Sequence, residues 1–431
     1  MTFDNLFRSK CLAADDAIEL LANGDHIVIP TGVAEPPRLL EALSRQRRTL
    51  SDVAVCQVLA MRKYDYFDPE TVHHVRHKAW FLGAGSRQGA QQGWVDVVPV
   101  HFSEIPRLIR QGHTRVDVLF SLASPMDQNG WFSLSLGTDY AIEAASKARM
   151  IVLETNPHVP MTHGNCHVHI SQVTAIVQDD EPVMEVGLPE IGPVQQAIAG
   201  HVAEIVPDGA TIQIGYGAVP DAIVMQLTNK KDLGVHTEMI GDGIVTLIEA
   251  GVVTNRKKTY LPGKMVATFA LGSSKLYRFM HQNPSLQMHP VDFTNDPWMA
   301  GHNSNFIAIN GTLQVDFFGQ CCSESQGVTP YSGTGGQNDF VRAATRSYGG
   351  KAIIGCPSTA KDDTISRIVP VLSEGAQVST GKNDVDYVVT EYGVAHLTGR
   401  SLKDRTLSLI RIAHPKFRDE LKEAARRRNI L

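Results

Sequence analysis

The sequence has 431 residues, of which 43% are hydrophobic and 20% charged, and its 40 basic and 45 acidic side chains give a formal net charge of −5. This composition is typical of a folded protein rather than a disordered one, and at roughly 150 residues per domain the length predicts two or three domains. A slightly acidic chain has no global field for a polyanion, and the dense basic run Arg426 to Arg428 is typical of a solvated helix face, so we expect no nucleic-acid partner.

Residues 1–16 lack the basic region followed by an apolar region that a secretory signal needs, and no apolar stretch reaches the ~18 residues of a membrane span. We therefore expect a cytoplasmic protein without a membrane partner. The cysteines fit a reducing compartment because they form no C-x-x-C pair. They are Cys11, Cys56, Cys166, Cys321, Cys322 and Cys356.

Two stretches far apart in the chain share the same order of features. Residues 23–32 and 208–217 each contain a turn, an apolar strand-like run and a closing glycine, and each is followed by a run with helical spacing of apolar residues. The matching pairs are Gly24 and Gly209, Ile27 and Ile212, Ile29 and Ile214, and Gly32 and Gly217. This repeated pattern predicts a duplicated α/β domain.

A domain boundary is expected near residues 187–195, where glycine and proline interrupt the pattern before a helical stretch that begins at Val194. Short apolar runs at 117–120, 150–153 and 352–354 are typical of strands covered on both faces by helices. We therefore predict an α/β fold with two tandem related domains, residues 1–190 and 191–431. The tail from Ser401 to Arg428 is helical in period.

One cluster of residues has the composition of a metal site. His163, Cys166, His167 and His169 lie within seven positions, but their alternation also suits a strand that divides them between two faces. Structural zinc sites draw their ligands from two separated pairs. We expect no metal here.

The glycine-rich loop at residues 215–220 has three possible functions. It follows an apolar strand and opens a helix, so its backbone N–H groups face whatever binds at the strand end. A dinucleotide fingerprint is disfavoured because Pro220 replaces the third glycine, and a purely structural turn is the alternative. The third possibility is an oxyanion or cofactor cradle beside a carboxylate.

Glu238 offers that carboxylate. It follows Val235 and precedes Met239 and Ile240, so it lies at the end of a predicted buried strand where desolvation makes it more nucleophilic. An acid at such a place is still more often structural than catalytic. Asp242 is placed to cap the next helix.

Several common enzyme classes lack their motifs in this sequence. The segment from Tyr331 to Gln337 is rich in glycine but has no Walker lysine, and residues 375–383 miss the Walker pattern by one residue and by a final Asn383. No G-x-S-x-G or H-E-x-x-H motif is present. Phosphoryl transfer, α/β-hydrolase chemistry and zincin chemistry are therefore disfavoured, whereas covalent chemistry through a carboxylate stays open.

Six segments that follow one another over nearly the whole chain carry a family resemblance. They are residues 124–130, 215–220, 236–239, 333–340, 389–395 and 412–418. Together they resemble the acetyl-CoA hydrolase/transferase family, and within it the 4-hydroxybutyrate and butyryl-CoA:acetate CoA-transferases, and their shared order makes them far more specific than one glycine loop.

The resemblance implies two CoA-transferase-type α/β domains, with the acyl pocket on the first domain's side and the nucleophile and CoA loops in the second. It implies that Glu238 is the nucleophile, that no cofactor is permanently bound, and that CoA is both substrate and covalent intermediate. Gln213 would orient the intermediate. The CoA site would include Gly215, Tyr216, Gly217, Ala218, Val219, Asn310, Gly333, Gly335 and Gly336, with Lys264, Lys275 and Lys351 as candidates for its phosphates.

The acids exchanged are not fixed by these motifs. Residues 30–33 and 58–63 are expected to face the acyl pocket, and acetate, butyrate, 4-hydroxybutyrate or a branched or dicarboxylic acid such as itaconate are open alternatives. So is acyl-CoA hydrolysis, in which water resolves the intermediate. From a different class, a non-catalytic nucleotide- or small-molecule-binding protein also fits the duplicated fold. The resemblance implies a homo-oligomer, such as a homodimer.

Overall fold

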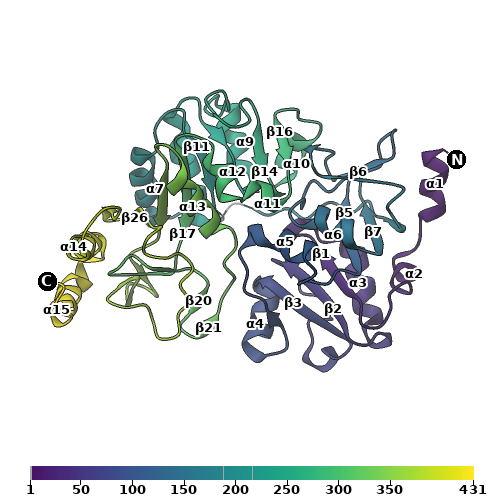
Figure 1. The fold of residues 1–431 in the computed structure, drawn as a ribbon, viewed down its shortest axis with the longest axis horizontal. Helices are drawn as coiled ribbons and strands as arrows, with labels where there is room; N and C mark the ends of the chain where they lie inside the picture. Colours follow the sequence, from purple (N-terminus) through teal and green to yellow (C-terminus); the bar gives the residue numbers. More distant parts are fainter. Residues whose placement is uncertain (1, 188, 216) are drawn as a thin grey trace. The chain divides into compact units, whose positions relative to one another are not determined.

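The computed structural model describes residues 2–187, 189–215 and 217–431, which fold into two compact units. The first unit contains the described residues up to 187 together with 239–242 and 266–294. The second contains those from 189 to 238, 243–265 and 295–431. Figure 1 follows the chain through both units.

The first unit is built on a parallel sheet with the strand order β10-β7-β5-β1-β2-β3-β4. Its central strands β1, β2, β5 and β7 are mostly apolar, as expected where helices cover both faces, whereas β3 carries Arg76, His77 and Lys78. The strands are β1 (His26–Ile29), β2 (Val53–Val58), β3 (Val75–Phe81), β4 (Asp96–Val97), β5 (Val118–Ala123), β7 (Met150–Thr155) and β10 (Ala175–Gln178).

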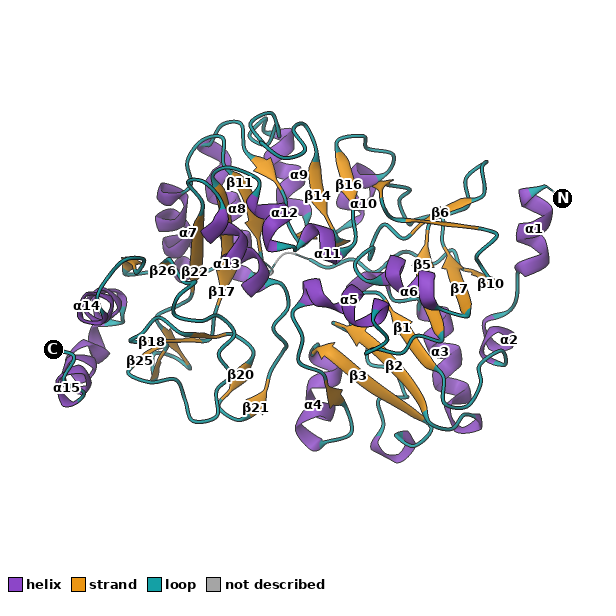
Figure 2. Ribbon diagram, viewed as in Figure 1, coloured by secondary structure: helices purple, strands orange, loops and turns teal. Residues whose placement is uncertain are grey.

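Helices pack on both faces of this sheet. On one face, Leu39, Leu40 and Leu43 of α3 join a core with Ile27 and Ile29 of β1. α5 and α6 lie side by side at the other face, where α6 contacts β1 and β5 (Figure 2). The helices are α1 (Phe3–Lys10), α2 (Ala14–Ile18), α3 (Pro37–Gln46), α4 (Ala84–Gln92), α5 (Ile105–Arg110), α6 (Ala141–Lys147), α10 (Ser274–Met280) and α11 (Val291–Thr294).

The second unit has its own sheet, with the order β12-β11-β17-β22-β26-β27. Its strands run parallel except for β27, which pairs antiparallel with β26. The strands are β11 (Thr211–Ile214), β12 (Gly234–Val235), β17 (Phe306–Gly311), β22 (Lys351–Gly355), β26 (Tyr387–Thr390) and β27 (Gly393–His396).

α7 and α8 pack together beside this sheet, and α12 and α13 form a second pair. Phe340 and Val341 of α13 share a buried core with Phe306 and Ala308 of β17. The helices are α7 (Pro193–Ile205), α8 (Ala218–Gln226), α9 (Asp242–Glu249), α12 (Pro297–Gly301), α13 (Gln337–Arg346), α14 (Leu402–Ile412) and α15 (Arg418–Arg427).

Short strands form small sheets around these two. In the first 187 residues they are β6 (Trp131–Ser133), β8 (His163–Gly164) and β9 (His167–His169). Later in the chain they are β13 (Met239–Ile240), β14 (Met265–Ala267), β15 (Phe269–Ala270), β16 (Leu286–Met288), β18 (Gln314–Asp316), β19 (Cys321–Cys322), β20 (Ser325–Gln326), β21 (Thr329–Pro330), β23 (Thr359–Ala360), β24 (Ile365–Ser366) and β25 (Ile368–Val369).

The predicted α/β class is confirmed. Both copies of the repeated pattern form a buried parallel strand, which is β1 in the first copy and β11 in the second. Each strand leads through a glycine-containing turn to a helix, α3 after β1 and α8 after β11. The predicted helix at Val194 begins one residue earlier, with Pro193 in its first turn, where a missing N–H costs nothing. The predicted helical tail is divided at Pro415 into α14 and α15. Among the described helices, none has the length and apolarity to cross a membrane.

Candidate active site

Glu238 lies just beyond the carboxyl end of β12. His236 continues the pairing with β11 by donating its backbone N–H to Ile212 O at 3.1 Å. The Thr237 hydroxyl accepts from Ile214 N at 3.3 Å. The chain is thus held against β11 up to the residue before Glu238, and ligands of parallel α/β sheets bind at this carboxyl edge.

Among the described residues, the partners of the Glu238 carboxylate are N–H donors and include no cation. Asn295 Nδ2 donates to Oε2 at 2.6 Å, and the backbone N–H of Gly336 donates to the same carboxylate. Burial raises the pKa of Glu238 to about 7, against the lowering effect of these two hydrogen bonds. A carboxylate without a cationic partner keeps its charge available to react with an electrophile.

Gly336 must be glycine because the carboxylate approaches it closely. A Cβ placed there would overlap Glu238 Oε2 and Asn295 Nδ2. The backbone itself does not require glycine, since its φ is −98° and ψ is 5°. Gly336 precedes α13, so its N–H belongs to the set of unpaired donors at that helix end.

A second cluster forms at the carboxyl ends of β11 and β17. Gln213 Nε2 donates to Asn310 Oδ1 at 3.2 Å, and Asn310 Nδ2 donates back to Gln213 Oε1 at 3.1 Å. A Cβ added at Gly215 would lie 3.2 Å from Asn310 Oδ1. The structure therefore brings Gln213, Gly215 and Asn310 together.

The loop then enters α8 through Gly217, whose φ of 127° with ψ of 175° is a region populated essentially by glycine. Ala218 and Val219 form the first turn of α8, so their N–H groups lie at the helix start. Tyr216 lies outside the described residues.

The glycine-rich segment at residues 331–337 is anchored at Thr334, between Gly333 and Gly335, and at Gln337, which follows Gly336. Thr334 Oγ1 donates to Glu324 Oε2 at 3.0 Å. Gln337 Nε2 donates to Ser323 Oγ at 3.0 Å and to Thr380 Oγ1 at 3.1 Å. These contacts fix the backbone that delivers the Gly336 N–H to Glu238.

The three candidate lysines are dispersed. Lys351 is the first residue of β22 and so lies at the amino ends of the strands, whereas Asn310 lies near the carboxyl end of β17. Lys351 Nζ donates to Ile205 O at 2.8 Å. This position argues against a role at the same site. Lys275 lies on α10 in the first unit, and Lys264 lies in the second.

Asn295 is a site residue that the sequence analysis missed. It precedes Asp296, which caps α12 by accepting from Trp298 N at 2.8 Å, so the Asn-Asp-Pro run has the pattern of an ordinary turn and helix start. Nothing in its neighbourhood signals contact with a distant glutamate. The Oδ1 of Asn295 is buried without a hydrogen-bond partner among the described residues, which is uncommon for a side-chain amide.

Within the histidine and cysteine cluster, Cys166 packs in the protein interior. Cys166 is buried and lies 3.4 Å from Thr162 Oγ1 and 3.6 Å from Ser133 Oγ. Within the described parts of the chain, no three His, Cys, Asp or Glu side chains are arranged to hold a metal ion.

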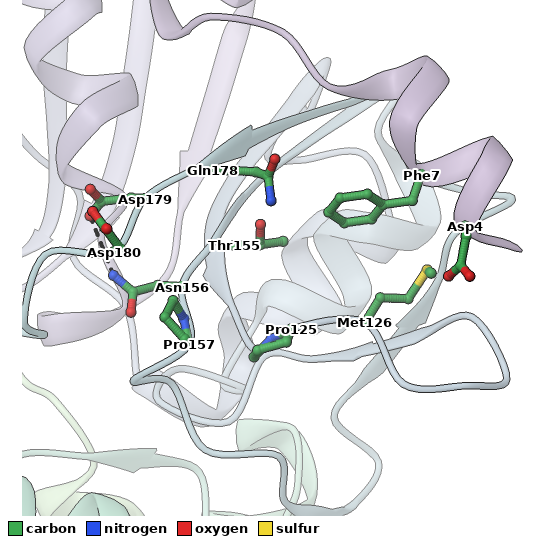
Figure 3. A pocket seen from close by; sticks show the side chains of 10 residues that line it. All are labelled: Asp4, Phe7, Pro125, Met126, Thr155, Asn156, Pro157, Gln178, Asp179 and Asp180. Atoms are coloured by element: carbon green, nitrogen blue, oxygen red, sulfur yellow. Dashed lines mark hydrogen bonds between the residues drawn. The ribbon is translucent and has the colours of Figure 1, made fainter.

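The first unit contains a pocket of about 690 Å³ at the ends of β7 and β10 (Figure 3). Its lining carries carboxylates and no basic side chain, so its charge is unfavourable for the phosphates of CoA. The lining residues are Asp4, Phe7, Pro125, Met126, Thr155, Asn156, Pro157, Gln178, Asp179 and Asp180.

Comparison with known proteins identifies the family. The acetyl-CoA hydrolase/transferase N-terminal domain matches residues 2–186, and the C-terminal domain of the same family matches residues 272–425. Succinyl-CoA:cyclohexane-1-carboxylate CoA transferase of Geobacter metallireducens is 48% identical over 99% of this chain and 98% of its own. 4-Hydroxybutyrate coenzyme A transferase of Clostridium kluyveri is 42% identical over 99% of this chain and 100% of its own.

Solved structures agree. RipA from Yersinia pestis superposes with a TM-score of 0.95 at 36% identity, covering 100% of both chains. 4-Hydroxybutyrate CoA-transferase from Porphyromonas gingivalis gives 0.85 at 36% identity, covering 99% of this chain and 100% of its own. The family resemblance predicted from the motifs is thereby confirmed: the chain belongs to the acetyl-CoA hydrolase/transferase family, as an enzyme of the CoA-transferase type.

Proposed function

We propose that this enzyme transfers CoA between a short-chain acyl-CoA and a carboxylic acid through a glutamyl-CoA thioester on Glu238. The observation that carries the proposal is the environment of this carboxylate, which is desolvated and has no cationic partner among the described residues, and which accepts hydrogen bonds from Asn295, at Oε2, and from the Gly336 N–H. Such a carboxylate is a stronger nucleophile than one in water.

In the first step, Oε1 of Glu238 attacks the thioester carbonyl carbon. A C–O bond forms, the C–S bond breaks, and CoA leaves as a thiolate, so an acyl-glutamyl anhydride remains on the enzyme. A carboxylate is a weak nucleophile towards a thioester, and binding the long CoA moiety supplies the energy that drives the two together.

In the second step, the thiolate attacks the glutamyl carbonyl carbon of the anhydride. A C–S bond forms, the anhydride C–O bond on that carbon breaks, and the first acid leaves as a carboxylate. A second carboxylate then reverses both steps and leaves as the new acyl-CoA. No redox change or net proton transfer is required.

The proposed mechanism gives a reason for the two donors at the Glu238 carboxyl group. When Oε1 is acylated, Oε2 becomes the glutamyl carbonyl oxygen, and negative charge develops on it as the thiolate attacks. Asn295 Nδ2 already lies 2.6 Å from Oε2. With the Gly336 N–H, it would form a preorganised oxyanion hole for this step.

Charge on the substrate's own carbonyl oxygen needs separate donors. Gln213 and Asn310 use one N–H each in their reciprocal pair, so each side-chain amide retains a second N–H for CoA or the oxyanion. We assign the N–H groups of Gly217, Ala218 and Val219 and the loop from Gly333 to Gly335 to CoA binding on the strength of the family motifs.

The names of the relatives indicate which class of carboxylic acid the enzyme exchanges. They include cyclohexane-1-carboxylate, 4-hydroxybutyrate and butyrate, each paired with or exchanged through CoA. We propose a monocarboxylic acid of this size range as one substrate, with acetyl-CoA, butyryl-CoA or succinyl-CoA as donors to be tested.

The assay that tests the function measures free CoA and new thioester together. We expect acyl-CoA alone to give a single turnover of enzyme-bound CoA, and steady turnover only when an acid is added, with one new acyl-CoA per donor consumed. A panel of donors and acids followed by mass spectrometry identifies the pair. Steady CoA release that is unaffected by added acid would instead identify a hydrolase, and no turnover of any acyl-CoA would favour a binding protein.

The pH dependence follows from Glu238. Only its ionised form attacks, and burial raises its pKa to about 7, so we expect kcat/KM for the acyl-CoA to rise with pH up to about 7 and to level off above it. Below that pH the value should fall about tenfold per unit. Initial rates at low acyl-CoA and saturating acid check this. A rate that is flat down to about pH 5 would contradict a raised pKa at the nucleophile.

A further inference from the structure

Lys258 is a buried amine without a carboxylate. Its exposed fraction is 4%, and Nζ donates to Val235 O at 2.9 Å and to Lys264 O at 2.6 Å. Among the described residues these two carbonyl groups are its only hydrogen-bond partners. Burial lowers the pKa of Lys258 to about 7. An unpaired buried lysine is costly, so its presence needs an explanation beyond packing.

The explanation begins with the strand that Lys258 contacts. β12 is an edge strand: it pairs with β11 on one side, and none of the described strands of the sheet lies on its other side. Residues 253–264 cover its open edge. Thr254 N and Asn255 N both donate to Leu233 O at 3.0 Å, and Asn255 Oδ1 accepts from Val235 N at 2.9 Å. Side chains of this loop therefore take both the N–H and the C=O of Val235.

The aliphatic part of the Lys258 side chain packs directly against Gly234 of β12. A Cβ at this position would overlap Lys258 Cγ and lie 2.9 Å from Cδ. The apolar stem crosses the strand at the one residue without a side chain, which brings Nζ to the next carbonyl. The loop also depends on a special backbone, since Asn255 has a φ of 57°, a left-handed conformation that asparagine tolerates.

We propose that Lys258 and Asn255 are positioning residues for Glu238. They hold both backbone groups of Val235, and from there the chain is fixed residue by residue through the His236 and Thr237 contacts with β11. Glu238 follows directly, so freedom at Val235 would be transmitted to its carboxylate. This inference rests on Glu238 being the nucleophile of the proposed function. Misplacement of a reacting group by about 1 Å costs on the order of 10²-fold in rate.

The test is Lys258→Met, which keeps the stem length and removes the two hydrogen bonds. We expect kcat to fall by about 10- to 100-fold, with KM for acyl-CoA changed less than about twofold. The melting temperature should stay near that of the wild type, because the stability lost with the two hydrogen bonds is offset by the removal of a buried charge. Lys257→Met, at the exposed neighbouring lysine, is the matched control and should leave kcat unchanged.

A second variant keeps the test decisive if Lys258→Met does not fold. Asn255→Gly preserves the left-handed backbone and removes the acceptor for Val235 N–H, so it should also lower kcat without a matching change in KM. Rates of glutamyl-CoA formation in a single turnover should fall by the same factor as kcat, with full final occupancy.

A lowered melting temperature with wild-type kcat in the folded variants would overturn the inference and leave a structural role only. Absence of a CoA adduct on Glu238 in the wild-type enzyme is a different failure, because it would contradict the proposed function itself. The two results are distinguishable, since one compares variants and the other concerns the parent enzyme.

Discussion

Replacing Glu238 by glutamine should lower CoA transfer by on the order of 10⁴-fold or more and abolish the enzyme-bound CoA adduct. Glutamine has nearly the same shape, and its amide oxygen can still accept from Asn295 Nδ2, which lies 2.6 Å from Oε2 in the parent. What is lost is the ionised oxygen that attacks the thioester. The fold should therefore persist while the covalent chemistry stops.

The measurement combines steady-state rates with the intact mass after incubation with acyl-CoA. The wild type should gain the mass of CoA less water, and hydroxylamine should release this CoA and leave the hydroxamate of Glu238, whereas Glu238→Gln should gain nothing. Glu249→Gln, at an exposed acid near the end of α9, is the control and should behave as the wild type. Retention of more than about a tenth of the activity by Glu238→Gln would exclude this residue as the nucleophile.

The same variant also reports on the cost of burying the charge. The pKa of Glu238 in the folded protein, about 7, is above the ordinary value of 4.5. Ionisation of this buried group therefore lowers the stability of the folded protein in full above about pH 7 and hardly at all below about pH 4.5. The neutral glutamine removes that cost. Its stability relative to the wild type should thus be greater at about pH 8 than at about pH 5, which thermal unfolding at the two pH values can show.

The sequence was sufficient to predict the elements that depend on local pattern. Short apolar runs between turn residues predicted β5, β7 and β22, and the echoed glycine turns predicted β1 and β11 with the helices that follow. The place of Glu238 at a strand end was predictable for the same reason, because Val235 and Ile240 mark the apolar segment around it.

The convergence on the carboxylate could not be predicted from local pattern. Asn295 and Gly336 are distant from Glu238 in the sequence and reach it through α12 and α13, whose packing is a tertiary property. Family motifs pointed to Gly336 but gave no reason for it, which the overlap of a Cβ with the carboxylate supplies. Lys258 was equally hidden, since a lysine in a polar loop normally lies in solvent.

Gly336→Ala should strongly lower the CoA-transfer activity. The added Cβ would overlap both Glu238 Oε2 and Asn295 Nδ2, so the carboxylate has to leave the position in which the two donors hold it. Because such a displacement exceeds the tolerance of a reacting pair, we expect kcat to fall by on the order of 10²- to 10³-fold. Alanine is compatible with the backbone angles of this residue, so the loss of stability should come from the displaced side chains alone and amount to about 1–3 kcal/mol.

Gly200→Ala is the matched control for this methyl, since it lies in α7 and an added Cβ would meet no atom within 4 Å. It should keep wild-type kcat and gain slightly in melting temperature, because alanine favours a helix. In Gly336→Ala the loss should fall on formation of the glutamyl-CoA adduct, measured in a single turnover, because the displaced carboxyl group no longer has both donors when the thiolate attacks. Adduct formation at the wild-type rate would show that the Gly336 N–H is not an oxyanion donor, even if overall turnover were slowed.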